Sequence, residues 1–119
     1  YIVARQIEGE THPSHVFHVY GVGDTYTPPE GLEMMAYALR VPYIGPVSFV
    51  GGDPSEVALP VSGNITIGEN DYTGFGRQYE PDAYDGHFVS FRNSDAMDDI
   101  VEFFGTGVTS EDGVPTIQD

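Results

Sequence analysis

The chain has 119 residues, of which 39% are hydrophobic, and this length suits one domain with a modest core. Nineteen acidic residues outnumber four arginines, and the formal charge of -15 argues against nucleic acid or an anionic membrane as a direct partner. The absence of cysteine excludes disulfides, thiol catalysis and cysteine-ligated zinc, and no apolar run approaches the roughly 18 residues of a membrane span.

The first elements expected along the chain are a strand and a helix joined by a loop. Residues 1–14 form a polar leading segment. Within residues 15–40, the β-branched and aromatic run Val16–Tyr20 predicts a buried strand, and the loop after it carries Asp24. Glu30–Leu39 predicts a helix, because apolar residues recur there at helical spacing: Leu32, Met35, Ala36 and Leu39.

Residues 41–77 form a Gly/Pro-rich excursion that differs in kind from the segments before it. Glycine and proline separate two short strand candidates, Val47–Val50 and Asn64–Ile67. A region of this length without helices is usually functional or packed on the surface as a loop. The run Thr73–Tyr79 predicts one more strand, which leads out of the excursion.

Residues 78–105 contain a loop with His87 and the last predicted helix. Ser94 is the expected N-cap of this helix, and Gly105 is the expected C-cap. An apolar stripe lies between them, formed by Met97, Ile100, Val101 and Phe104. Residues 106–119 are expected to be a tail.

Strands and helices that alternate in this way favour an α/β fold with a parallel sheet. Two strands and two helices are too few to cover both faces of such a sheet, so the rest of the sheet is expected from another segment or chain. The chain opens on Tyr1 rather than on Met, and we expect that a preceding segment has been removed.

Asp24 and His87 each follow a predicted strand and each precede a predicted helix. In open α/β sheets, functional groups gather beyond the carboxyl ends of the strands. If the two strands are neighbours, both side chains reach the same edge of the sheet. A buried carboxylate there accepts the imidazole Nδ1–H, and the imidazole then moves a proton to and from a hydroxyl nucleophile.

The phrases around these two residues resemble the C-terminal segment of an α/β-hydrolase, a superfamily of serine esterases and lipases. HVYGVGDTYTPPEG is similar to the family's strand and acid loop, and DGHFVSF followed by SDAMDDIVEFF is similar to its histidine loop and last helix. The order Asp before His also matches the family's Ser, Asp, His order. The resemblance covers residues 15–40 and 78–105, and it implies that Asp24 is the triad acid and His87 the triad base.

The sequence departs from the family pattern in two respects. Asp24 and His87 are 63 residues apart (87 − 24), so residues 41–76 are expected to be an insertion close to the substrate entrance. There is also no G-x-S-x-G motif. Ser48 in GPVSFVG has glycines three residues away on each side, which is not the spacing of a nucleophile turn, and we reject it.

The resemblance therefore implies the C-terminal part of a serine hydrolase that cleaves carboxylic esters in small molecules, lipids or polymers. The nucleophile and the oxyanion hole are expected from an N-terminal segment or companion chain that carries G-x-S-x-G. No cofactor is expected. The acidic composition suits a secreted or extracytoplasmic setting.

Other interpretations of the same residues stay open. Asp24 also suits an ordinary turn, and His87 a surface loop in which Asp82 and Asp85 are simple polar residues. The chain is then an acidic binding module, with Glu69, Asn70 and Asp71 as oxygen ligands for calcium, or a hydrolase-like protein without activity. A zinc site is not expected at His12, His15 and His18, because His15 and His18 point to opposite faces of one strand.

Overall fold

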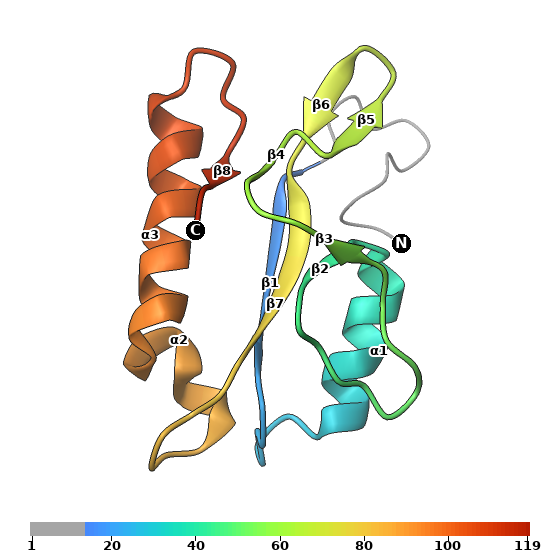
Figure 1. Ribbon diagram of the computed structural model, residues 1–119, viewed down its shortest axis with the longest axis vertical. Helices are drawn as coiled ribbons and strands as arrows, with labels where there is room; N and C mark the ends of the chain where they lie inside the picture. Colours follow the sequence, from blue (N-terminus) through green and yellow to red (C-terminus); the bar gives the residue numbers. More distant parts are fainter. Residues whose placement is uncertain (1–13) are drawn as a thin grey trace.

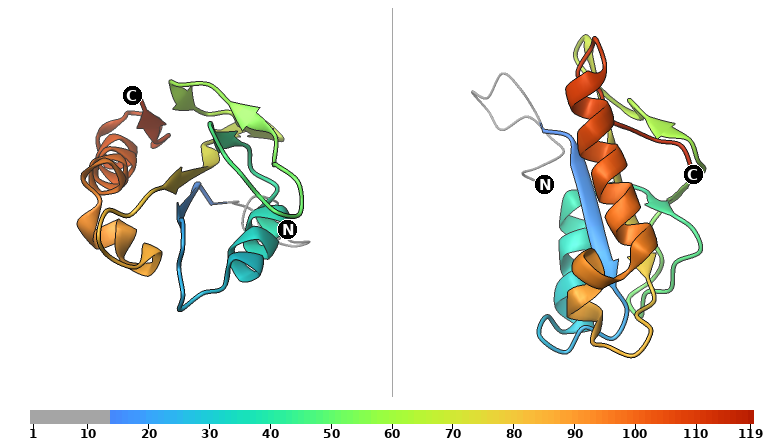
Figure 2. Two further views of the ribbon diagram at one scale, coloured as in Figure 1. Left: turned by 60° about the horizontal axis from the view of Figure 1, so that its bottom comes forward. Right: turned by 90° about the vertical axis from the view of Figure 1, so that its left-hand side faces the viewer.

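The computed structural model describes residues 14–119, and its centre is a four-stranded parallel sheet with the strand order β1-β7-β2-β3. The strands are β1 (Val16–Gly21), β7 (Gly74–Tyr79), β2 (Tyr43–Ile44) and β3 (Glu56–Val57). Helix α1 (Pro29–Leu39) covers one face of the sheet, while α2 (Val89–Arg92) and α3 (Ser94–Thr109) cover the other (Figures 1 and 2). The predicted α/β class with a parallel sheet is therefore confirmed.

The side chains of β1 and β7 alternate between two apolar cores, as the period of a strand requires. Val16 and Tyr20 pack with α1 on one face, in a cluster that also contains Tyr43 and Leu39. On the opposite face, Phe75 packs with Phe103 of α3 and with other apolar residues, among them Ile44, Val61 and Ile117. Each helix is thus fixed to the sheet by an apolar contact of its own.

Two small antiparallel pairs complete the fold. Strand β4 (Val61–Ser62) pairs with β8 (Thr116–Ile117), and β5 (Ile65–Ile67) pairs with β6 (Asn70–Tyr72). The β5–β6 hairpin leads directly into β7, so it lies at the amino end of that strand, at the top of Figure 1. This part of the Gly/Pro-rich segment is therefore far from the loops that carry Asp24 and His87, at the bottom of Figure 1.

Several expectations for the individual elements are confirmed. The strand after residue 15, the helix that ends at Leu39, the strand near Asn64–Ile67 and the strand that ends at Tyr79 are all present. The strand expected at Val47–Val50 is wrong, because these residues form a loop and the preceding pair Tyr43–Ile44 joins the sheet instead. Residues 41–77 are thus not only an excursion, since they supply β2 and β3 to the main sheet.

The end of the chain also differs from the expectation. The N-cap of α3 is Asn93, whose side chain accepts a hydrogen bond from the Ala96 N–H, and the helix passes through Gly105 to Thr109. Residues 106–119 are not a simple tail, because β8 pairs with β4 and Ile117 is fully buried. The Thr106 hydroxyl accepts a hydrogen bond from the Thr116 N–H, which fixes the returning chain to α3.

The predicted apolar stripe of α3 is mostly exposed, and of its four residues only Ile100 is half-buried. The buried residues of this helix are Ala96, Asp99 and Phe103. Four apolar side chains of the helix are exposed: Met97, Val101, Phe104 and Val108. The helix therefore presents apolar surface both to the sheet and to solvent. Within residues 14–119, no helix is both long and apolar enough to cross a bilayer.

Candidate active site

Asp24 and His87 come together because β1 and β7 are parallel neighbours. The register places the last residue of β1, Gly21, beside the last residue of β7, Tyr79. The loops that follow the two strands therefore start at the same edge of the sheet, at the bottom of Figure 1. One loop carries Asp24, and the other leads into the short 3₁₀ helix η1 (Gly86–Phe88), which carries His87. The condition stated for the two predicted strands, that they are neighbours, is met.

The side chains of Asp24 and His87 contact each other directly. His87 Nδ1 lies 3.2 Å from Asp24 Oδ2. The Asp24 carboxylate is buried, with 7% of its side chain exposed, whereas 43% of the His87 side chain is exposed. The pair thus consists of an inner acid and an outer imidazole, and no hydrogen bond to His87 Nε2 forms within residues 14–119.

The second oxygen of Asp24 is held by its own loop. Asp24 Oδ1 accepts hydrogen bonds from the backbone N–H groups of Tyr26 at 2.8 Å and Thr27 at 2.7 Å. The preceding residue, Gly23, has a φ of 69°, a left-handed conformation that other residues adopt only with strain. The loop therefore orients the carboxylate so that only Oδ2 points toward the imidazole.

Close backbone contact brings the histidine loop against the end of β1. A Cβ atom on Gly86 would lie 2.2 Å from the carbonyl oxygen of Val22, and a Cβ on Gly21 would lie 1.9 Å from the carbonyl oxygen of Gly86. Both approaches are too short for any side chain. Glycine at these two positions therefore permits the contact between the Asp24 loop and the His87 loop.

Aromatic rings surround the imidazole. The ring centroid of Tyr26 lies 4.7 Å from that of His87, and the centroid of Phe88 lies at 5.2 Å. Tyr26 was not a predicted site residue, although it lies within the phrase around Asp24. Asp85 was expected only as a polar loop residue, yet its carboxylate accepts hydrogen bonds from both loops. Contacts of this kind depend on how two distant loops meet, and no spacing in the sequence reports them.

A second polar cluster lies on the α3 side of the sheet. Asp99 Oδ2 accepts a hydrogen bond from Arg77 Nη1 at 2.8 Å and another from the Tyr79 hydroxyl. Burial, followed by this hydrogen bond, raises the pKa of Tyr79 well above its usual value. Tyr79 is therefore neutral at physiological pH, and the cluster ties the end of β7 to the middle of α3.

The other residues considered from sequence do not join the pair. Ser48 exchanges hydrogen bonds with the side chain of Gln78. His15 accepts a hydrogen bond from the Thr73 N–H, and His18 contacts the Tyr43 hydroxyl. Asp71 accepts a hydrogen bond from the Thr66 hydroxyl. His12 lies outside the described residues, and residues 14–119 contain no group of three or more His, Cys, Asp or Glu side chains placed to hold a metal ion.

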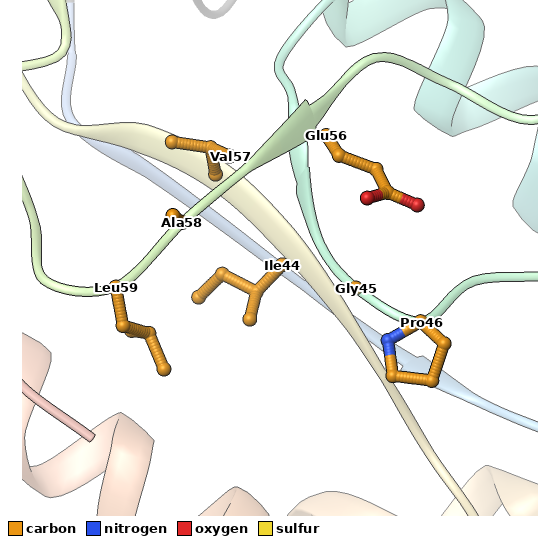
Figure 3. Close-up of a pocket in the computed structure, with 7 residues that line it drawn as sticks. All are labelled: Ile44, Gly45, Pro46, Glu56, Val57, Ala58 and Leu59. Atoms are coloured by element: carbon orange, nitrogen blue, oxygen red, sulfur yellow. The ribbon is translucent and has the colours of Figure 1, made fainter.

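A surface pocket of the described residues lies away from this pair. A pocket of about 550 Å³ is formed where β2 and β3 continue into their loops, and Ile44, Leu59 and Glu56 are among its lining residues (Figure 3). Neither Asp24 nor His87 lines it. The acid–histidine pair therefore lies outside this pocket, at the edge of the sheet where the loops after β1 and β7 begin.

Comparison with known proteins does not assign the chain to a family. No protein-family model matches the chain, and no sufficiently similar curated protein or solved structure was found. The functional interpretation consequently depends on the site itself.

Proposed function

We propose that this chain supplies the acid and the base of a serine hydrolase that cleaves carboxylic esters. Asp24 is the acid, His87 is the base, and an N-terminal segment or companion chain brings the serine and the oxyanion hole. The observation that carries the proposal is the contact between His87 Nδ1 and the buried Asp24 Oδ2 at 3.2 Å. An ordinary turn aspartate needs no such partner, and neither does a surface histidine.

The geometry suits proton transfer in acyl-group chemistry. A carboxylate that accepts Nδ1–H holds the imidazole in the tautomer whose Nε2 is free to accept a proton. His87 would take the proton from the serine hydroxyl as it attacks the ester carbonyl, and would return it to the leaving alcohol. Asp24 stabilises the imidazolium formed between these steps. Ester rather than amide substrates are preferred by analogy with α/β-hydrolases, and small, lipid and polymeric esters all fit the proposal.

The exposed apolar side of α3 supports the expectation of a further segment. Val101 is 70% exposed and Phe104 is 66% exposed, on a helix whose other side is packed on the sheet. A groove of about 460 Å³ between β1 and α3 lies next to them, lined in part by Phe17, Ile100 and Phe103. Contiguous apolar surface of this kind is normally covered in a functioning protein. We propose that the serine-bearing part covers it.

The first test is the presence of the nucleophile. The segment that precedes residue 1 in the gene product, or a chain that co-purifies with this one, should contain G-x-S-x-G directly after a strand. The assembled protein should then react with a fluorophosphonate probe at that serine and hydrolyse p-nitrophenyl esters. The absence of such a serine from both sources would reject the hydrolase interpretation.

The isolated 119-residue chain tests the main alternative, a complete binding module without catalysis. Because of its exposed apolar surface, we expect the isolated chain to associate or to lack cooperative unfolding. A monomer that melts cooperatively and shows dispersed amide resonances would favour the binding module. An assembled protein that folds normally but does not react with the fluorophosphonate would instead indicate a hydrolase-like protein without activity.

A further inference from the structure

We propose that Asp85 is a positioning residue that holds His87 in register with Asp24 by joining their two loops. This inference rests on the proposed function, because it concerns the same acid–base pair. It goes beyond that function in assigning a role to a third carboxylate that does not contact the imidazole nitrogens.

The Asp85 carboxylate forms hydrogen bonds with residues next to each member of the pair. Its Oδ1 accepts the backbone N–H of Thr25 at 3.1 Å and the backbone N–H of His87 at 2.9 Å. Its Oδ2 accepts the Thr25 hydroxyl at 2.5 Å. Thr25 directly follows Asp24. One carboxylate therefore fixes the backbone beside the acid and the backbone of the base at the same time.

Asp85 also determines where the histidine-bearing turn begins. It is the N-cap of η1, with extended backbone angles and a side chain that accepts the N–H of His87 inside the first turn. A 3₁₀ helix of this length has few hydrogen bonds of its own. The cap therefore contributes much of what orients His87, and the bonds to Thr25 relate that orientation to the loop that carries Asp24.

The charge of Asp85 fits this role. Its pKa is lowered from the ordinary value of 3.8, first by the hydrogen bond from the Thr25 hydroxyl and then by the backbone N–H of His87. The carboxylate is consequently ionised at neutral pH, and charge-assisted hydrogen bonds are the stronger kind. Asp82 is exposed, lies in the same loop and forms no hydrogen bond within the described residues, so it is a matched control.

The test compares four variants in the assembled protein. Asp85→Ala removes all three bonds, and we expect kcat for p-nitrophenyl ester hydrolysis to fall roughly 10- to 100-fold with KM nearly unchanged, because misplacement of a catalytic group acts on the chemical step. Asp85→Asn keeps an oxygen acceptor for both N–H groups, and activity should stay within about threefold of the wild type. Thr25→Val removes only the hydroxyl bond and should give an intermediate kcat. Asp82→Ala should leave kcat unchanged.

A second measurement reads the imidazole itself. Long-range ¹H–¹⁵N correlation spectra of His87 should show the Nδ1–H tautomer in the wild type and in Asp85→Asn, and a shift toward the Nε2–H tautomer in Asp85→Ala. The inference is overturned if Asp85→Ala retains both kcat and the tautomer. If Asp85→Ala does not fold, the inference is overturned when Thr25→Val has the kcat and the His87 tautomer of the wild type. If the wild type has no esterase activity, the proposed function fails, while the tautomer comparison still decides the role of Asp85.

Discussion

The aromatic ring of Tyr26 lies against the imidazole of His87, with ring centroids 4.7 Å apart and planes inclined by 34°. The same residue donates its backbone N–H to Asp24 Oδ1. Tyr26 therefore connects the two members of the pair twice, through its backbone to the acid and through its ring to the base. Its side chain is 68% exposed, so the ring lies beside the imidazole at the surface.

Replacement of Tyr26 tests the contribution of the ring alone. An aromatic pair contributes about 0.5–1.5 kcal/mol beyond area burial, so Tyr26→Ala should lower kcat/KM of the assembled protein by roughly two- to tenfold. Tyr26→Phe keeps the ring and should retain the wild-type value. Steady-state ester hydrolysis measures both variants, and equal losses in the two would mean that the hydroxyl rather than the ring is important.

Gly86→Ala tests the close approach between the two loops. The new Cβ would meet the Val22 carbonyl oxygen at 2.2 Å and the Asp24 backbone nitrogen at 2.7 Å, so the histidine loop has to move. Overpacking of this kind typically costs about 1–3 kcal/mol of unfolding free energy, and we expect esterase activity to be lost with it.

The matched control for Gly86→Ala is Gly105→Ala in α3, where no atom lies within 4 Å of the added Cβ. Alanine favours the helix by about 0.5–1 kcal/mol over glycine, so this variant should be slightly more stable and fully active. Urea unfolding of the assembled protein, monitored by circular dichroism, distinguishes the two variants. A Gly86→Ala variant as stable and active as the wild type would contradict the close contact.

Asp99→Ala tests the cluster that ties β7 to α3. The change leaves the Arg77 guanidinium and the Tyr79 hydroxyl without their shared acceptor. Removal of one partner from a buried pair costs about 3–5 kcal/mol, and we expect the lower end of this range because the Arg77 side chain is 26% exposed. Urea unfolding of the assembled protein measures this loss, and Asp98→Ala, at the neighbouring exposed position, should change the unfolding free energy little. If both variants lose a similar amount of unfolding free energy, the cluster around Asp99 does not stabilise the contact between β7 and α3.

The pH dependence of stability should carry a contribution from Asp85. Its pKa is lower in the folded protein than the ordinary value of 3.8, chiefly through the Thr25 hydroxyl, so the folded state favours the ionised form. The stabilisation is therefore complete above the unfolded-state pKa and is lost as the pH falls through the folded-state pKa. In the assembled protein, the difference in melting temperature between the wild type and Asp85→Asn should be constant from neutral pH to about pH 5 and should shrink at lower pH. If the difference in melting temperature stays constant below about pH 5, the Asp85 carboxylate does not make this contribution to stability.

Part of the site was predictable because parallel strands have a simple geometry. Val16–Tyr20 is a short β-branched and aromatic run, and Thr73–Tyr79 is a short run with two aromatic residues. Parallel strands that are neighbours place the loops that follow them at the same edge of the sheet. The sequence therefore predicted that Asp24 and His87 meet, provided that the two strands are neighbours. The α1 helix was predicted for a similar reason, since its apolar residues repeat at helical spacing.

Other features were not predictable because they depend on contacts across the fold. Tyr43–Ile44 is too short to give a strand pattern, and it pairs only because β3 and β7 lie on either side of it. Gly105 is a good helix terminator in isolation, but the helix continues because its next turn is held to the returning chain through Thr106 and Thr116. Asp85 and Tyr26 act on the opposite loop, and no local pattern reports such partners.

The most direct test of the account is a double-mutant cycle on Asp24 and His87 in the assembled protein. Residues that act as one catalytic unit show strongly non-additive losses. Asp24→Asn and His87→Ala should each lower kcat for ester hydrolysis by at least about 10³-fold, and the double variant should be no worse than His87→Ala alone. Independent, multiplicative losses, or a His87→Ala variant that keeps its activity, would contradict the claim that the two residues form the acid–base pair of a serine hydrolase.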